Sequence, residues 1–342
     1  MQELLKQVSR SFYLTLRILP HSIKAQLSLA YLLARAADTV ADTQLVDVQR
    51  RREVLLQIRN CIQEACEGKS PTLPDFGQFE TAGSGTPAER ALLENLGNLL
   101  GNLRGFTADD RLRIGKVLDI ITHGQETDLV RFGTASEDGI VALAADQELD
   151  EYTYHVAGCV GEFWTHMCRV HLFPEYPLNE EILLDRGVRF GKGLQLVNIL
   201  RDLPKDLRQG RCYLPEEQLA KHGLKPQDLL NAGNMDRFQT LYNDYVRQAE
   251  NHLAAGWQYT VMLPFRSIRV RLACAWPILI GISTLGKLGK SNVLDPQHPI
   301  KLSRVEIRRL IFRSILLYAN PKAWNGQFEN IRNRASKESI KN

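Results

Sequence analysis

The amino-acid sequence predicts an all-α fold. Over most of the 342-residue chain, apolar residues recur at three- and four-residue steps, the period of an amphipathic helix. No segment combines the alternation of a strand with the turn residues of a β-hairpin. The composition, 44% hydrophobic and 24% charged, is that of a folded globular protein and excludes a disordered chain. We therefore expect a single helical domain over residues 1–342.

Three segments show the helical period most clearly, and they lie in the first, middle and last thirds of the chain. The residues that carry the period are Leu27, Ala30, Tyr31, Ala34 and Ala37 in the first segment, Val188, Gly191, Leu194, Gln195, Asn198 and Ile199 in the second, and Val305, Arg308, Arg309 and Phe312 in the third. Each segment is expected to present one face to a common core.

Two stretches interrupt the helices. Residues 68–88 hold several glycines and prolines among polar residues and predict a long irregular loop, inserted between helices of one bundle. Residues 287–299 form a second irregular stretch. The last residues, about 330–342, are predicted to be a basic C-terminal tail.

Composition also limits the function. A net charge of +4 is too small an excess to indicate nucleic acid, and the six dispersed cysteines, with no CxxC, indicate reduced thiols in a cytosol. The cluster of His166, Cys168 and His171 lacks the second ligand pair of a zinc motif. The longest uncharged run, between Arg271 and Lys287, is too short to cross a bilayer and contains a proline, so we expect no transmembrane segment.

An aspartate pair follows the first apolar helix. Asp38 and Asp42 are four residues apart and so share one face of a helix, with Arg35 one turn earlier. Two like charges at this spacing destabilise an isolated helix. The preceding residues are apolar, which predicts that the pair ends a buried helix and faces a cavity. A solvated helix face is the alternative interpretation of one such pair.

A second oxygen-bearing stripe lies in the middle of the chain. Asn198, Asp202 and Asp206 follow at four-residue steps, with Arg201 beside them. Pro204 lacks the N–H that a regular helix needs, so we expect the helix to kink or end there and Asp206 to swing out of line. Carboxylate and amide oxygens on two such helices suit Mg²⁺, which takes its remaining ligands from water and substrate phosphates. Both stripes are therefore predicted to bind Mg²⁺ and a diphosphate.

Four ordered motifs resemble the squalene and phytoene synthase family, from Ser9 to about Arg309. They are Ser9-Arg10-Ser11-Phe12, Tyr31-Leu-Leu-Ala-Arg35-Ala-Ala-Asp38, Tyr152-Thr-Tyr-His-Val156-Ala157-Gly158-Cys-Val-Gly161, and Asn198-Ile-Leu-Arg201-Asp202 continuing to Asp206 and Gly210-Arg211-Cys-Tyr213-Leu214-Pro215. The resemblance implies an isoprenoid-synthase-type helical bundle with a central active-site cavity, and a Mg²⁺-dependent prenyltransferase.

The resemblance also assigns roles to individual residues. Metal ligands would be Asp38, Asp42, Asn198, Asp202 and Asp206; diphosphate ligands would be Arg10, Arg35, Arg201 and Arg211; catalytic side chains would be Tyr31, Tyr152 and Tyr213; and the prenyl-tail pocket would contain Phe12, Val156, Ala157, Gly158 and Gly161. Core packing is the alternative role for each tyrosine. One departure concerns Ala41, where many relatives carry an acid, and it leaves the number of metal ions open.

The implied reaction is the head-to-head (1–1′) condensation of two farnesyl diphosphates through presqualene diphosphate, followed by reduction with NADPH to squalene. Proton loss or water instead of hydride would give phytoene, dehydrosqualene or hydroxysqualene. The residues Ala275-Trp276-Pro277 and Ile300 to Arg304 look more like squalene synthases than phytoene synthases. Lys301 and Arg304, with Arg308, would meet the phosphate of NADPH, with a solvated basic face as the alternative.

A basic face near the C-terminus has another interpretation. Arg304, Arg308, Arg309 and Arg313 would attract an anionic membrane surface, into which a greasy product could leave. Eukaryotic relatives carry a C-terminal spanning anchor that this sequence lacks, so we expect a cytoplasmic protein in peripheral contact with membranes. A remote alternative is a catalytically silent homologue at such a surface. The prenyl chain length and oligomeric state stay open.

Overall fold

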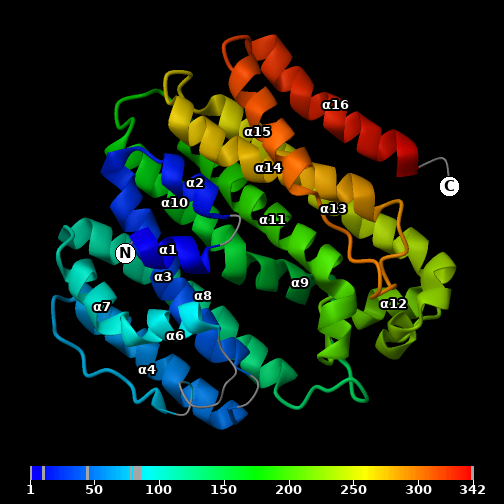
Figure 1. The fold of residues 1–342 in the computed structure, drawn as a ribbon, viewed down its shortest axis with the longest axis horizontal. Helices are drawn as coiled ribbons and strands as arrows, with labels where there is room; N and C mark the ends of the chain where they lie inside the picture. The colour runs from blue at the N-terminus through cyan, green and yellow to red at the C-terminus, as the bar shows by residue number, and fades with distance from the viewer. Residues whose placement is uncertain (1, 10–11, 44–45, 78, 80–85, 340–342) are drawn as a thin grey trace. The chain divides into compact units, whose positions relative to one another are not determined.

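The described residues of the computed structural model, 2–9, 12–43, 46–77, 79 and 86–339, are mostly helical, with two strands of two residues each (Figure 1). They group into two units, Met1–Gly133 with Phe163–Glu175, and Thr134–Glu162 with Tyr176–Asn342. Each unit is described separately below. The prediction of an all-α fold is confirmed.

The first unit contains the N-terminal helices. They are α1 (Gln2–Val8), α2 (Phe12–Ile18), α3 (His21–Asp42), α4 (Val48–Cys66), α6 (Pro87–Glu94), α7 (Leu96–Arg104) and α8 (Ala108–Phe132), together with most of α10 (Cys159–His171). Helix α3 supplies the core of this unit: Leu29, Leu32 and Leu33 are fully buried, and α4, α7 and α8 pack around it. This burial explains the apolar period of residues 27–37.

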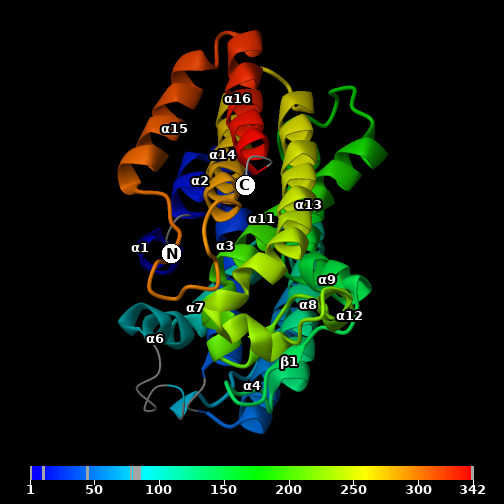
Figure 2. The same ribbon diagram turned by 90° about the vertical axis from the view of Figure 1, so that its right-hand side faces the viewer.

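The second unit contains the longest helices. Its elements are β1 (Val141–Ala142), α9 (Asp146–Thr153), the π-helical turn η1 (Tyr154–Gly158), α11 (Glu180–Arg208), β2 (Arg211–Cys212), α12 (Glu216–Lys221), the 3₁₀ turns η2 (Pro226–Leu230) and η3 (Ala232–Asn234), α13 (Met235–Met262), α14 (Ile268–Leu288), α15 (Arg304–Leu317) and α16 (Pro321–Ser339). Helices α11, α13 and α14 lie side by side in both views and form the core (Figures 1 and 2). The two-residue strands β1 and β2 pair in parallel.

The helix bounds correct one end of the predicted loop. Helix α4 ends at Cys66 and α6 begins at Pro87, so residues 87 and 88 are helical, while residues 78 and 80–85 of the predicted loop lie outside the described residues. The reason is that Thr86 caps α6 and Pro87 occupies its first turn, where the missing N–H costs nothing. The second stretch joins α14 to α15. All six cysteines lie among the described residues, and none of them forms a disulfide.

Among the described residues, one helix is long and apolar enough by composition to cross a membrane. It is α14, and 72% of its most apolar window is buried inside the protein. Burial of this kind is typical of a core helix in a folded bundle.

Candidate active site

The first aspartate pair lies at the C-terminal end of α3. Asp42 is the last residue of the helix and is exposed, while Asp38 is half-buried with 38% of its side chain accessible. Carboxylates at this end meet the negative pole of the helix dipole as well as each other. The last turn of α3 has no basic residue to offset them. The pair is therefore electrostatically costly, as expected where a cation binds.

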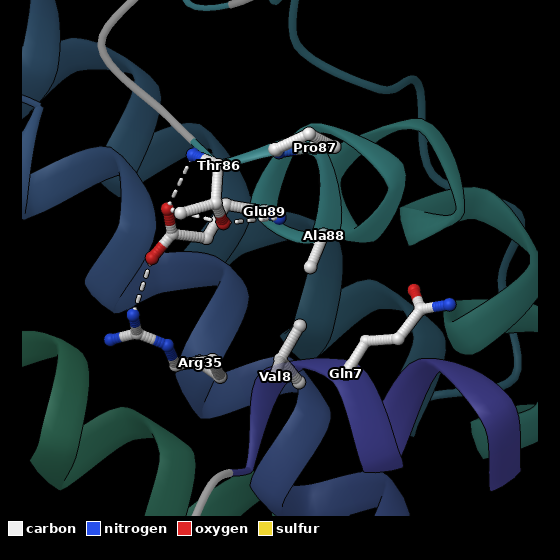
Figure 3. Close-up of a pocket in the computed structure, with 7 residues that line it drawn as sticks. All are labelled: Gln7, Val8, Arg35, Thr86, Pro87, Ala88 and Glu89. Atoms are coloured by element: carbon white, nitrogen blue, oxygen red, sulfur yellow. Dashed lines mark hydrogen bonds and ion pairs between the residues drawn. The ribbon is translucent and has the colours of Figure 1, made fainter.

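Arg35 links this pair to a carboxylate that the sequence analysis did not single out. Its guanidinium pairs with Asp38 and, at 2.5 Å from Nη2 to Oε1, with Glu89 of α6 (Figure 3). Glu89 in turn accepts hydrogen bonds from the backbone N–H and hydroxyl of Thr86, at 2.9 and 3.0 Å. The capping box of α6 thus orients Glu89, and Glu89 orients Arg35.

The pKa values of the two acids beside Arg35 are shifted in opposite directions. Burial, and then the like charge of Asp42, raise the pKa of Asp38 to about 6 in spite of Arg35. Burial would also raise the pKa of Glu89, but the hydrogen bonds from Thr86 and the charge of Arg35 outweigh it and lower that pKa. Glu89 is thus the firmly ionised partner, and Asp38 is the acid whose charge a bound cation would stabilise.

A pocket of about 460 Å³ opens beside Arg35 within the first unit (Figure 3). Gln7 and Val8 of α1 line one side, and the first turn of α6, from Thr86 to Glu89, lines the other. Near this pocket, the hydroxyl of Tyr31 lies 3.4 Å from the carbonyl oxygen of Val8. The pocket therefore combines the ion-paired guanidinium of Arg35 and carboxylate of Glu89 with apolar side chains.

The second motif lies on α11, and the helix end that was one of the two expectations at Pro204 is not observed. The helix does not end at Pro204 but continues to Arg208, so Asp206 stays in helical register after Asp202. Because proline has no backbone N–H, Pro204 cannot donate a hydrogen bond to the carbonyl of Leu200. That carbonyl instead accepts a hydrogen bond of 3.1 Å from the hydroxyl of Tyr242 on α13. A side chain from a neighbouring helix replaces the missing backbone donor.

Arg201 and Asp202 form a two-point ion pair in this motif. The Nε–Oδ1 distance is 2.8 Å and the Nη2–Oδ2 distance is 2.6 Å. This bond to Asp202 is the main reason that the pKa of Arg201 is raised above its ordinary value. Both side chains are partly exposed, at 33% and 42%, so they remain accessible to a phosphate or a metal ion.

Two of the predicted catalytic tyrosines meet in the second unit. The rings of Tyr152 and Tyr213 stack with centroids 4.5 Å apart and planes 26° from parallel. Gln195 donates to the Tyr152 hydroxyl at 3.4 Å, and Asn198 donates to Gln195 at 3.4 Å. A chain of polar contacts therefore runs from the second metal motif to the stacked rings.

Gly210 sets the position of Arg211. Its φ of +78° follows the end of α11, and a Cβ there would lie 2.3 Å from the backbone nitrogen of Ser136. Only glycine fits both conditions. The turn brings Arg211 into β2, where it pairs with Val141 of β1.

The small residues after Tyr152 pack against α11. A Cβ on Gly161 would lie 1.9 Å from the carbonyl oxygen of Gly187, and a Cβ on Gly191 would lie 2.0 Å from that of Ala157. Gly158 is buried, while Val156 and Ala157 are half-buried in the π-helical turn. These residues thus serve a close helix–helix approach, and their role in a prenyl-tail pocket stays a prediction.

Four predicted site residues remain, namely Arg10, Phe12, Lys301 and Arg304. Arg10 lies outside the described residues, and Phe12 opens α2 with its side chain likewise outside them. Lys301 and Arg304 are exposed at the start of α15, and the backbone carbonyl of Lys301 accepts from Lys287 at 3.4 Å. Their contact with a nucleotide stays a prediction.

The donor sets fit Mg²⁺ of the kind predicted. In the described part of the chain, no three His, Cys, Asp or Glu side chains converge into a complete metal site. Each motif instead presents one or two carboxylates on an accessible helix face, with an arginine beside them. Mg²⁺ accepts such a partial set, because water and phosphate oxygens complete its shell.

Comparison with known proteins identifies a family. The model of the squalene/phytoene synthase family matches residues 5–306. A bifunctional lycopene cyclase/phytoene synthase of Blakeslea trispora is 29% identical over 64% of this chain, and the squalene synthase of Bos taurus is 25% identical over 82% of it. The chain spans only 33% and 61% of the length of these relatives.

Solved structures agree on the fold. TcSQS in complex with a ligand has a TM-score of 0.75 at 19% identity, covering 99% of this chain and 97% of that one. A dehydrosqualene synthase has a TM-score of 0.64 at 23% identity, covering 92% and 94%. Since the family model covers most of the sequence and these folds match, the chain belongs to the squalene/phytoene synthase family.

Proposed function

We propose that this protein is a Mg²⁺-dependent prenyltransferase that condenses two farnesyl diphosphates head to head through presqualene diphosphate, and then reduces the product to squalene with NADPH. The observation that carries the proposal is the pair of arginine–aspartate motifs. Arg35 with Asp38 and Asp42, and Arg201 with Asp202 and Asp206, each present a cation beside accessible carboxylates. Two diphosphate-binding motifs suit a reaction that consumes two diphosphates.

The chain's own residues account for the first step. Cleavage of the allylic C–O bond leaves a diphosphate anion and a carbocation. The guanidinium groups of Arg35 and Arg201 bind phosphate oxygens, and the aspartates of the two motifs would hold Mg²⁺, which when bound would neutralise further charge on the leaving group. Glu89 and Asp202 hold the two guanidinium groups in place, so little rotamer freedom is lost on binding.

The stacked tyrosines suit the carbocation. Aromatic π faces stabilise a cation that would otherwise react with water, and the stacking of Tyr152 on Tyr213 leaves the outer faces of the two rings for this role. The Tyr152 hydroxyl accepts a hydrogen bond from Gln195. We assign to this hydroxyl a proton relay toward the departing diphosphate.

The fate of the last cation decides the product. Lys301 and Arg304 are the residues that would hold the phosphate of NADPH, which supplies a hydride. Similarity to both squalene and phytoene synthases supports one alternative, in which proton loss or water gives dehydrosqualene, phytoene or hydroxysqualene without a reductant.

A product assay tests the proposal. The purified protein is incubated with farnesyl diphosphate and Mg²⁺, with and without NADPH, and the extract is analysed by mass spectrometry. Squalene formed only with NADPH is the expected result, whereas the same dehydrosqualene or hydroxysqualene in both reactions would select the alternative. Asp38→Asn and Asp202→Asn should each abolish turnover, and the exposed Asp138→Asn serves as the matched control. Absence of product from farnesyl or geranylgeranyl diphosphate would leave a silent homologue.

A further inference from the structure

Helix α15 exposes large apolar side chains on the face that carries its arginines. Val305, Phe312, Ile315 and Leu316 are 64%, 68%, 50% and 68% exposed. They follow the three- and four-residue steps of one helical stripe, in which Arg308, Arg309 and Arg313 are also exposed. Isolated apolar residues on a surface are ordinary, but a contiguous stripe of large ones marks an interaction site.

The opposite face of α15 is packed against other helices. The exposed stripe is therefore not the face by which α15 joins the core. Ser314 is fully buried and accepts a 3.0 Å hydrogen bond from the indole of Trp276 on α14. Gln327 of α16 donates to the carbonyl of Leu310 at 3.3 Å. Figure 2 shows α15 beside α14 and α16, which take up this inner face. The helix therefore has both a packed side and an unpacked side.

The C-terminal end of α15 is also fixed to the turn between α13 and α14. Tyr318, which follows the helix and is buried, stacks on Phe265 with ring centroids 5.1 Å apart, and its hydroxyl donates to the carbonyl of Phe265 at 2.5 Å. The outer stripe of α15, with its apolar residues and arginines, is called the α15 surface below.

The charge on the α15 surface has one sign. The only acid in the helix, Glu306, is turned toward α14, where it pairs with Lys287 at 2.8 Å and caps the helix through Ser303. Four arginines, at 304, 308, 309 and 313, thus stand without an acidic residue among the exposed positions of α15. Large apolar side chains interleaved with arginines are typical of a helix that lies in the interface of an anionic bilayer.

We propose that the α15 surface binds the face of a membrane rich in anionic lipid. Arg309 and Arg313 lie at the headgroups, and Phe312 and Leu316 enter the boundary with the acyl chains. A partner protein would need an acidic side chain opposite each arginine and an apolar side chain opposite each apolar residue. An anionic bilayer presents negative headgroups and acyl chains everywhere on its surface, so it needs no such matching. The proposal is independent of the reaction that the enzyme performs, because Phe312, Leu316, Arg309 and Arg313 have no part in the proposed site.

Vesicle flotation of the full chain tests the proposal. The probes are vesicles of phosphatidylcholine alone and vesicles with about 30 mol% phosphatidylglycerol, at low salt and at about 0.5 M salt. We expect binding to the anionic vesicles, weaker binding at high salt and little binding to the neutral ones. Equal binding to both kinds of vesicle, or no binding to either, would overturn the proposal.

Two double variants locate the binding. The first double variant, Phe312→Ser with Leu316→Ser, removes apolar contact with the acyl chains. The second, Arg309→Gln with Arg313→Gln, removes positive charge, and each arginine lost should weaken binding to anionic vesicles roughly fivefold. All four side chains are exposed, so thermal unfolding should match the wild type. Leu112→Ser with Val130→Ser on α8, 72% and 62% exposed, is the matched control and should bind normally. Normal binding by both double variants would place the contact elsewhere.

A second copy of the chain is the competing occupant. Sedimentation velocity of the same proteins distinguishes it. If the wild type is a dimer that fails to float with vesicles, and Phe312→Ser with Leu316→Ser makes it a monomer, the α15 surface is a contact between copies and the lipid proposal is wrong.

Discussion

Asp38 shows at the scale of one residue how a binding site opposes stability. Its carboxyl lies beside Asp42 at the negative end of α3, and its pKa is raised to about 6. In the unfolded chain an aspartate titrates near 3.9. Between about pH 3.9 and 6, Asp38 is more often protonated in the folded protein than in the unfolded chain. The free energy of unfolding therefore falls as the pH rises through this range and Asp38 ionises in the folded state.

We therefore expect Asp38→Asn to stabilise the protein at pH 7.5 while abolishing turnover. Because the side chain is 38% exposed, solvent screening reduces the gain to about 1 kcal/mol. Urea unfolding at pH 7.5 and pH 5 measures it, and the gain should shrink at pH 5, where wild-type Asp38 is mostly protonated. An equal gain at both pH values would contradict the assigned titration. Turnover of the wild type should likewise fall as pH drops below 6.

Glu89 is the site residue that the sequence analysis missed. It lies 54 residues from Arg35, across a stretch rich in glycine and proline, and no helical period links the two positions. A local signal was available, since Thr86-Pro-Ala-Glu89 has the pattern of a capping box. That pattern predicts the start of a helix, but only tertiary packing brings the glutamate against Arg35.

Helix α11 illustrates how an element survives an unfavourable residue. Pro204 cannot donate to the carbonyl of Leu200, and sequence reasoning alone predicted a kink or an end of the helix there. Tyr242, 42 residues later, is fully buried and supplies the donor from α13. The stripe of Asn198, Asp202 and Asp206 stays in register as a result.

A double-mutant cycle tests this compensation. Tyr242→Phe should destabilise the protein by about 1–2 kcal/mol, because a buried carbonyl loses its donor. In the Tyr242→Phe background, Pro204→Ala should recover most of that loss, since alanine restores a backbone N–H directed at Leu200. Urea unfolding of the two single variants and the double variant gives the coupling energy. Additive effects would show that the hydroxyl does not compensate for the proline.

A second prediction for helix α11 concerns its close approach to the π-helical turn η1. Gly191→Ala should destabilise the protein by about 3 kcal/mol, because its Cβ would lie 2.0 Å from the Ala157 carbonyl and the backbones must separate. Gly326→Ala on α16 is the matched control: no atom lies within 4 Å of the new Cβ, and the change should stabilise the helix by about 0.5–1 kcal/mol. Thermal unfolding of both variants measures the contrast. A tolerated Gly191→Ala would mean that the two segments are not in such close contact.

At the scale of the whole molecule, each aspartate motif belongs to a different compact unit. If both motifs bind diphosphate through Mg²⁺, inorganic pyrophosphate with Mg²⁺ should raise the melting temperature by about 5 °C at saturating concentrations. Chelation of the metal with EDTA should reverse the shift, because the negatively charged aspartates can hold the pyrophosphate anion only through the metal ion. Asp42→Asn and Asp206→Asn should each reduce the shift, which differential scanning calorimetry would measure. An undiminished shift in both variants would exclude the aspartates from metal binding.

The sequence by itself determined the all-α class, the main helices and the two aspartate stripes. These features depend on spacings of three or four residues, and such spacings are a property of the helix rather than of its surroundings. The family motifs likewise lie within short segments, so comparison with relatives confirmed the family.

Only the tertiary structure decided the contacts between distant segments. The Tyr152–Tyr213 stack, the Glu89–Arg35 ion pair and the Tyr242–Leu200 hydrogen bond join residues 42 to 61 positions apart. It also decided that the apolar stripe of α15 faces outward, although the same residues could equally have lined a core. The physical reason is that helical period places a side chain on a face, whereas the packing of other helices decides what that face meets.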